Sequence, residues 1–219
     1  MPDAEDLNAA MVDAETSRIR CLYALIQAGD TGLAQRLEGR GFLFTDIRLT
    51  LRRDESAVPP CRKDDIQVRL AVEEDIPRLR TIASVSFTQT RFHEVSGLDR
   101  RRCNDFYPTW IENSCRGFED AVLLAMLNDC PVGYITCNVT DGRVGRIGLF
   151  AVHPEAQGRG VGAALINASI RWFRDHDCGE IQVVTQGDNI KAQRLYQKAG
   201  FATYSVQLWF HRWFEERST

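Results

Sequence analysis

The chain has 219 residues, of which 44% are hydrophobic and 26% are charged, and its formal net charge is −3. This length allows an ordinary buried core in one or two domains, and the small net charge gives no overall field toward nucleic acid or anionic lipid. No run of 18 apolar residues is present, so we expect no membrane span.

The first ten residues and the cysteines indicate the compartment. The segment MPDAEDLNAA is acidic and has no apolar core, which is not the pattern of a secretory signal. The seven cysteines are odd in number and include no C-x-x-C pair, which argues against a disulfide framework and a structural zinc site. The four histidines are dispersed and suggest no metal. We therefore expect a cytoplasmic protein with reduced thiols and no metal.

Residues 1–55 predict a small α/β unit. An apolar segment at 19–26 precedes a helix around 32–38 and an alternating strand at 42–52. Residues 56–65 are polar, charged and contain two prolines, which is typical of a linker.

Residues 66–219 predict a larger domain whose elements alternate between strand and helix. In chain order we expect a strand at 66–72, a helix at 74–87, helical residues at 99–118 broken at Pro108, and strands at 121–127, 132–139 and 146–152. The three strands form an antiparallel meander in which Asp141-Gly142 makes a hairpin turn.

The pattern turns helical again after the meander. From Val161 the apolar positions are Val161, Leu165, Ala168 and Trp172, and the predicted opposite side holds Asn167, Arg171 and Arg174. A strand at 181–186, a helix that ends at the capping residue Gly200, and a strand from Phe201 complete the chain. The predicted class is α/β (α+β), with a mixed, mostly antiparallel sheet flanked by helices.

The sequence also contains an internal echo. QAGDTGLAQRLEGRGF at 27–42 is similar to TQGDNIKAQRLYQKAGF at 185–201. Duplication and independent use of the same helix-cap-strand chemistry both explain it. Aligned by letters, Thr31 falls where Asn189 stands and Glu38 where Tyr196 stands, so the N-terminal unit alone is expected to be inactive.

A glycine-rich loop joins the strand at 146–152 to the next helix. It reads Gln157-Gly158-Arg159-Gly160-Val161-Gly162. Glycines let the backbone approach an anion, and the positive end of the following helix suits a pyrophosphate. A dinucleotide-binding fingerprint and a P-loop are excluded, because the sequence has neither G-x-G-x-x-G with its acidic partner nor G-K-[ST].

Two spaced motifs occur in order: Q-x-x-G-x-G at 157–162 and N-x-x-A-x-x-L-Y-x-x-x-G-F at 189–201. With them, residues 66–211 resemble the GNAT superfamily of N-acetyltransferases. The resemblance implies a GNAT fold preceded by a half-GNAT-like α/β unit, and acetyl-CoA (coenzyme A) as co-substrate. The cofactor-binding residues that it implies are Phe150, Ala151, Val152, Gln157, Gly158, Arg159, Gly160, Val161, Gly162, Asn189 and Ala192.

By the same resemblance, Tyr196 would face the sulfur of the thioester and act as the catalytic acid. A phenol with a pKa of about 10 can give its proton to a leaving thiolate, whose conjugate acid has a pKa of about 8.5. An ordinary core tyrosine is the alternative role for Tyr196, and helix capping is the alternative for Asn189.

Residues 75–93, 105–117 and 183–201 resemble the dTDP-fucosamine acetyltransferases more narrowly. These enzymes acetylate the 4-amino group of a nucleotide-linked 4-amino-4,6-dideoxyhexose, which the resemblance implies as the acceptor. Arginine suits phosphate and aromatic rings suit a base or sugar, so the expected acceptor-binding residues are Arg91, Phe92, His93, Tyr107 and Trp110. His93 and Glu94 are candidate bases for the amine proton, with bulk water as the alternative.

The resulting prediction is direct transfer of an acetyl group in a ternary complex, with no covalent enzyme intermediate. The alternative acceptors are a protein N-terminus, an antibiotic or a small amine. A non-catalytic acyl-CoA-binding module is the alternative of a different class. We expect no nucleic-acid or membrane partner, and a homodimer is one option for the oligomeric state.

Overall fold

The computed structural model describes residues 4–54, 66–88, 90, 98–140 and 143–214. Its main elements are α1 (Ala4–Thr16), β1 (Cys21–Gln27), α2 (Thr31–Glu38), β2 (Leu43–Asp54), β3 (Gln67–Leu70), α3 (Ile76–Ser86), α5 (Arg100–Asn113), β4 (Ala121–Leu127), β5 (Cys130–Thr140), β6 (Val144–Val152), α6 (Val161–Asp175), β7 (Glu180–Gln186), α7 (Ile190–Lys198) and β8 (Ala202–Trp213). Short helical turns lie at Glu73–Asp75, Ser114–Phe118 and Pro154–Ala156.

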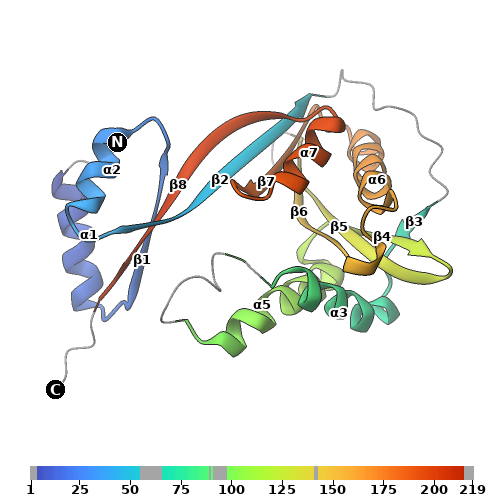
Figure 1. Cartoon of the computed structure of the whole chain (residues 1–219), viewed down its shortest axis with the longest axis horizontal. Helices are drawn as coiled ribbons and strands as arrows, with labels where there is room; N and C mark the ends of the chain where they lie inside the picture. Colours follow the sequence, from blue (N-terminus) through green and yellow to red (C-terminus); the bar gives the residue numbers. More distant parts are fainter. Residues whose placement is uncertain (1–3, 55–65, 89, 91–97, 141–142, 215–219) are drawn as a thin grey trace. The chain divides into compact units, whose positions relative to one another are not determined.

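The strands form one mixed sheet in the order β1-β8-β2-β7-β6-β5-β4-β3 (Figure 1). The predicted meander is confirmed, because β4 pairs antiparallel with β5 and β5 with β6. β6 pairs in parallel with β7, as expected for strands joined by a helical crossover. The predicted fold class is therefore confirmed. The predicted turn Asp141-Gly142 lies outside the described residues.

The chain divides into two compact units. The first holds residues 1–49, 186–188 and 205–219, and the second holds residues 50–185 and 189–204. The end of β8 belongs to the first unit, and its residues Gln207–Trp213 pair with the whole of β1. The predicted linker at 56–65 lies outside the described residues, and the predicted division into 1–55 and 66–219 stays a prediction.

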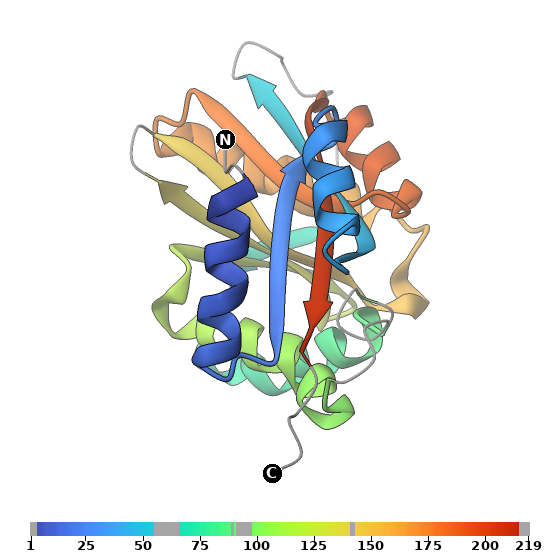
Figure 2. The ribbon, with the colours of Figure 1, turned by 90° about the vertical axis from the view of Figure 1, so that its left-hand side faces the viewer.

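In the first unit, α1 and α2 lie over the same face of β1 and β8 (Figure 2). Each helix turns apolar side chains toward those strands, as its spacing of apolar residues requires. The buried core consists of Ile26, Leu33, Leu37, Phe42 and Phe210.

In the second unit, α3 and α5 cover one face of the sheet and α6 and α7 cover the other (Figure 1). The α3 and α5 side packs on β4, β5 and β6 around Leu79, Ile82, Ile111, Leu124 and Tyr134. On the other side, a Cβ built at Gly145 of β6 would lie 2.5 Å from the ring of Phe173 of α6. Glycine at this position therefore lets α6 lie close against the sheet.

Two local predictions are wrong. Pro108 does not break a helix, because α5 runs through it from Arg100 to Asn113. Pro108 is buried, and packing on that face outweighs the hydrogen bond that proline cannot make. Asn167 does not lie on an exposed polar face of α6, since it is only 8% exposed. Residues 164–170 are all buried, so α6 is enclosed more widely than the spacing predicts.

The hydrogen bonds of α2 and α7 correct the register of the internal echo. Asp30 caps α2 through Leu33 N, and Asn189 caps α7 through Ala192 N. Both helices end in the same way: Phe42 N donates to Leu37 O, and Phe201 N donates to Tyr196 O.

Counted from these caps, Asp30 corresponds to Asn189 and Leu37 to Tyr196. The alignment by letters, with Thr31 and Glu38 in those places, is therefore wrong by one residue. The matching backbone bonds define equivalent positions, whereas the shared A-Q-R-L string does not. Leu37 has no proton to donate, so the first unit still lacks a counterpart of Tyr196.

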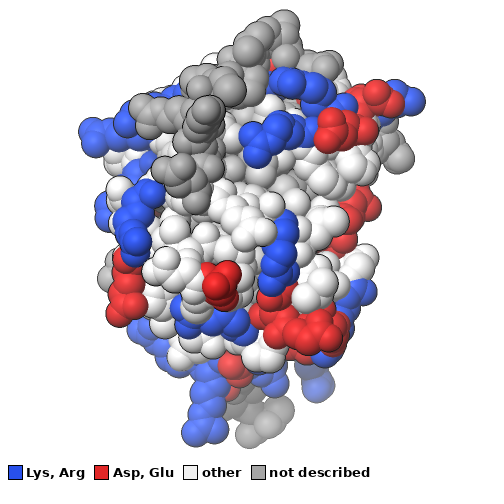
Figure 3. Space-filling view, turned by 90° about the vertical axis from the view of Figure 1, so that its right-hand side faces the viewer, with Lys and Arg blue, Asp and Glu red and all other residues white. Residues whose placement is uncertain are grey.

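On the face shown in Figure 3, Lys and Arg side chains lie interspersed with Asp and Glu side chains around an uncharged area. That face carries no field of a single sign of the kind that nucleic-acid binding uses. None of the described helices is both long enough and apolar enough to cross a membrane.

Candidate active site

The loop between β6 and α6 depends on two glycines in the left-handed region. Gly158 has a φ of 75° and Gly160 a φ of 88°, which residues with a Cβ rarely adopt. Gly160 is the N-cap of α6, and no side chain of the described residues caps this helix. The first amides of a helix have no partner within it, so those from Val161 onward can bind an anion at its positive end.

Gly162 has a different role from the other loop glycines. A Cβ there would lie 2.9 Å from Leu195 Cδ2 and 3.3 Å from Phe150 Cζ. Gly162 therefore allows α6, α7 and the Phe150 ring to pack together.

Gly133 of β5 fixes the start of α6 from the sheet side, because its Cβ would meet Val161 and Leu165 at 3.2 Å. Gly133 lies outside the motifs that predict the site. A glycine inside the strand VGYITC is the signal that marks such a close approach.

β6 and β7 separate halfway along their length. Their described ladder pairs Val144–Ile147 with Glu180–Val183 and then stops. β6 continues to pair with β5 as far as Val152. The backbone of residues 148–152 is thus unpaired on the side of β7, and an extended ligand arm can lie there. The predicted cofactor residues Phe150, Ala151 and Val152 all belong to this stretch.

The side chains of Gln157 and Arg159 are both exposed. The Gln157 amide donates to Val152 O at 3.3 Å, and Ser86 Oγ donates to the same oxygen at 3.5 Å. A ligand arm that pairs with Val152 O must therefore compete with Gln157. Arg159 forms no ion pair among the described residues, so its guanidinium is free to meet a phosphate.

Asn189 has the predicted alternative role of a helix cap. Its side-chain oxygen accepts a hydrogen bond from Ala192 N at 3.1 Å. This leaves the amide nitrogen of Asn189 as the group that can reach a ligand. Ala192 lies in the first turn of α7, at the site of this cap.

Tyr196 is brought to the unpaired half of β6. Its ring centroid lies 6.1 Å from that of Phe150 and 5.8 Å from that of Phe201, and the residue is only 3% exposed. Burial raises the pKa of the Tyr196 hydroxyl above its ordinary value. The hydroxyl therefore stays protonated at neutral pH and can act as a proton donor beside Phe150.

Of the predicted acceptor-binding residues, Tyr107 and Trp110 are described, and they belong to an aromatic cluster on α5 and at the end of α3. Tyr107 stacks on Phe87 at 4.2 Å and lies parallel to Trp110 at 6.2 Å. Phe106 meets both rings edge-on and is 40% exposed. A partly exposed aromatic surface of this kind can stack a base or a sugar ring. Arg91, Phe92 and His93 lie outside the described residues.

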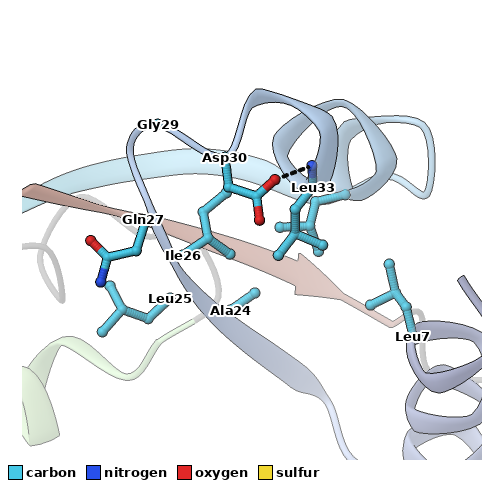
Figure 4. Close-up of a pocket in the computed structure, with 9 residues that line it drawn as sticks. Leu7, Ala24, Leu25, Ile26, Gln27, Gly29, Asp30 and Leu33 are labelled. Carbon is cyan, nitrogen blue, oxygen red and sulfur yellow. Dashed lines mark hydrogen bonds between the residues drawn. The ribbon is translucent and has the colours of Figure 1, made fainter. Parts of the chain in front are cut away.

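The first unit contains a cavity of about 720 Å³ that differs from this site (Figure 4). Its lining is mainly apolar and consists of Leu7, Ala24, Leu25, Ile26, Gln27, Gly29, Asp30, Leu33 and Leu37. The Asp30 carboxylate is used within the protein, because it accepts the Leu33 amide at 3.0 Å. The Asp30 side chain thus caps the start of α2, whereas no described side chain caps the start of α6.

A sheet that opens beside an uncapped helix N-terminus is suited to hold a long ligand that carries a diphosphate. Residues 77–201 match the family model described as the acetyltransferase (GNAT) family. This match spans the loop, the separated strands and α7, and covers more than half of the chain. The protein therefore belongs to the GNAT family and is an acetyl-CoA-dependent N-acetyltransferase, as predicted.

Among curated proteins, the chain is 32% identical over 200 residues to dTDP-fucosamine acetyltransferase of Escherichia coli O6:H1. The alignment covers 87% of this chain and 81% of that protein. Its fold is similar to that of a conserved protein of unknown function from Staphylococcus epidermidis, with a TM-score of 0.72, 18% identity, and coverage of 97% and 81%. PaiA N-acetyltransferase from Thermoplasma acidophilum, solved with coenzyme A, has a TM-score of 0.53 at 14% identity, with coverage of 68% and 99%.

Two features fit coenzyme A to this chain. The uncapped start of α6 can supply amides to a diphosphate, and the unpaired side of β6 can supply a strand edge to the pantetheine arm. Acetyl-CoA brings the activated acetyl thioester, and the chain must supply grip, orientation and proton transfer.

Proposed function

We propose that the protein acetylates the 4-amino group of a dTDP-linked 4-amino-4,6-dideoxyhexose. The observation that carries this proposal is the 32% identity to dTDP-fucosamine acetyltransferase over 87% of the chain. A match confined to the acetyl-CoA motifs supports only the family, whereas this one also covers the acceptor side and part of the first unit. The aromatic cluster of Phe87, Phe106, Tyr107 and Trp110 adds a surface on which a thymine or a deoxysugar can stack.

In this proposal each part of the site has one task. The amides at the start of α6 and the Arg159 guanidinium hold the diphosphate of the co-substrate. The backbone of residues 150–152 orients its arm, and an N–H there polarises the thioester carbonyl. Tyr196 gives its proton to the departing sulfur. Holding both substrates in one site supplies much of the rate enhancement.

Two described cysteines with raised pKa values, Cys115 and Cys137, favour direct transfer. Burial raises the pKa of Cys115 to about 11, and it raises the pKa of Cys137 on β5 further still. Both thiols therefore remain protonated at neutral pH and are poor nucleophiles. A covalent acetyl-enzyme on either residue is disfavoured.

The test is a panel of amines with the purified full-length protein and acetyl-CoA, followed by release of free thiol. The panel contains dTDP-4-amino-4,6-dideoxygalactose, its gluco isomer, dTDP-glucose as a control without an amine, kanamycin, spermidine and an N-terminal peptide. We expect kcat/KM for one of the two dTDP amino sugars to exceed that for the other amines by about 100-fold or more.

The other outcomes separate the alternatives. A preference for the peptide, kanamycin or spermidine would overturn the acceptor while leaving the enzyme class intact. Coenzyme A binding in calorimetry without thiol release from any amine would instead indicate a binding module.

A further inference from the structure

The segment before β4 places an acidic side chain, Glu119, at an irregularity of the sheet. The register of β5 and β6 shifts between Ile135 and Cys137, so that Gly148 and Leu149 of β6 lie at the bulge opposite Thr136. Leu149 N donates to Thr136 Oγ1 at 2.8 Å, which closes the bulge. This bulge immediately precedes Phe150, in the half of β6 that is unpaired toward β7.

The Glu119 carboxylate occupies the space above Gly148. A Cβ built at Gly148 would lie 2.9 Å from Glu119 Oε1 and 2.6 Å from Thr136 Oγ1. Any side chain at position 148 would displace these groups. Since a strand rises about 3.3 Å per residue, the carboxylate lies within about 7 Å, along the strand, of Phe150.

The surroundings of Glu119 hold the carboxylate without a cation. Burial raises its pKa, the neighbouring charge of Asp120 adds to this, and the Trp110 indole and the Asn138 amide oppose it. The Trp110 N–H lies close enough to act on this pKa but falls short of full hydrogen-bond geometry. Among the described residues, no Lys, Arg or His forms an ion pair with Glu119.

The other titratable and charged groups near Glu119 do not neutralise it. Cys137 of β5 is protonated, since burial and the charge of Glu119 both raise its pKa. Arg146 lies opposite Asn138 in the β5–β6 ladder and forms no described ion pair with Glu119. Burial of a carboxylate without a cation costs free energy, and a positively charged ligand would lower that cost.

Glu119 and Tyr196 reach β6 from opposite faces of the sheet. Leu149 and Ala151 pack in the core with α3 and α5, and Trp110 of α5 lies beside Glu119. Phe150 turns the other way, toward Gly162 of α6 and toward Tyr196. A carboxylate and a phenol therefore flank the backbone stretch that is proposed to hold the thioester.

We propose that Glu119 is the acceptor-side carboxylate, which binds the ammonium group of the acceptor and takes up its proton. This inference rests on amine acetylation alone and not on the identity of the sugar.

The acceptor nitrogen loses two protons in each turnover. The ammonium loses one proton to Glu119, which passes it to solvent, and the neutral nitrogen forms the C–N bond as the C–S bond breaks. The nitrogen loses a second proton when it becomes an amide. Tyr196 gives one proton to the sulfur and is reprotonated afterwards, so this second proton is balanced by the one that the thiol gains. Each turnover releases one proton.

The experiment compares the pH dependence of kcat/KM in Glu119→Gln and in the matched neighbour Asp120→Asn. Asp120 Oδ2 accepts Val139 N at 2.7 Å and has no place in the proposed proton transfer. The acceptor is dTDP-4-amino-4,6-dideoxygalactose or, if the amine panel prefers another member, that amine. We expect Glu119→Gln to lower kcat by about 10²–10³-fold and to remove the acidic limb of the profile, while Asp120→Asn keeps the limb.

Two further variants keep the test decisive if Glu119→Gln folds poorly. Glu119→Asp retains a carboxylate and should retain the acidic limb at a reduced rate. Trp110→Phe removes an N–H that lowers the pKa of Glu119, so the acidic limb should move to higher pH. Thermal unfolding and coenzyme A affinity are measured for every variant.

An acidic limb that survives in Glu119→Gln, or that is lost in Glu119→Asp, would overturn the proposal. Either result stands whichever amine is accepted, so it is distinct from a failure of the amino-sugar assignment.

Discussion

Burial has different chemical consequences for Tyr196 and Glu119, because the neutral form of each is a different kind of reactant. Burial raises the pKa of both groups. For the phenol, this keeps the hydroxyl protonated at neutral pH, so that it is available to donate when a thiolate develops beside it. For the carboxyl group, it makes the ionised form a stronger base. The proposed acid and the proposed base thus owe their protonation states to their surroundings.

Replacement of Tyr196 by phenylalanine tests its proposed role as the catalytic acid. The ring contacts with Phe150 and Phe201 remain, so we expect coenzyme A affinity by calorimetry to change less than about twofold. Loss of the hydroxyl should lower kcat by about 10²–10³-fold in the thiol-release assay. Tyr204→Phe, at an exposed tyrosine of β8, is the control and should behave as wild type. An unchanged kcat in Tyr196→Phe would assign this residue to the core.

Glu119 also makes a prediction about stability. Its pKa in the folded state is raised above the unfolded value of 4.5, so the folded state binds a proton more tightly. The resulting stabilisation is complete below that unfolded value and is lost as pH rises through the raised folded pKa. Neutral glutamine has no such dependence.

We therefore expect Glu119→Gln to be more stable than wild type at pH 7, with the difference shrinking toward about pH 4. Urea unfolding at a series of pH values measures it. A variant that is less stable than wild type at pH 7 would show that Glu119 is held by favourable native contacts instead.

At the scale of elements, the start of α6 depends on the backbone of Gly160. A Cβ at this position would meet nothing closer than Ile66 Cδ1 at 3.6 Å, so a substitution acts through the φ of 88° and not through a clash. Gly160→Val should distort the amides that are proposed to bind the diphosphate, and should weaken coenzyme A binding by at least about tenfold, or 1.4 kcal/mol.

Gly41→Val is the matched control for Gly160→Val. Gly41 has a φ of 78° and open space around its Cβ, but it lies after the end of α2. It should lower stability by a similar amount and leave coenzyme A affinity intact. Equal affinity of the Gly160→Val protein and wild type in calorimetry would remove the loop from the binding site.

Elements with a clear apolar period were predictable from the sequence, and so was the order of the sheet's antiparallel meander. Pro108 and Asn167 were not, because packing of α5 and α6 overrides the local preference of one residue. The loop glycines were found as a motif, yet the separate packing role of Gly162 depends on Leu195 and Phe150. Glu119 was not predictable, because a Glu-Asp pair before a strand is an ordinary polar connection in the sequence. Only the fold brings Glu119 next to the bulge at Gly148.

At the scale of the whole molecule, the strand order supports duplication as the origin of the internal echo. Half of the sheet reads β1-β8-β2-β7. Exchanging β1 with β7 and β2 with β8 turns this order into β7-β2-β8-β1, which is the same order read from the other end. The corresponding caps at Asp30 and Asn189, and the left-handed Gly41 and Gly200, strengthen this relation. Independent capping chemistry explains the turns but not the symmetric strand order.

β2 and β8 contribute residues to both compact units, so we expect the units to unfold together. Leu37→Ala removes a side chain that is 1% exposed in the core of the first unit and should cost about 2–5 kcal/mol. Calorimetry should show a single transition at a lower temperature. Leu43→Ala, at a side chain that is 69% exposed, should leave the transition in place. Two resolved transitions in Leu37→Ala would mean that the units are thermodynamically independent.

The early end of the β6–β7 ladder has a consequence for how the protein responds to its co-substrate. In the free protein, the main-chain N–H groups that residues 148–152 turn toward β7 have no partner in the β6–β7 ladder, so deuterium should replace their hydrogens quickly. Saturation with coenzyme A should slow that replacement in the middle of a strand whose first half, Val144–Ile147, is slow in either state. Deuterium exchange in the second half of β6 would then measure coenzyme A binding, and exchange in the first half would measure global unfolding.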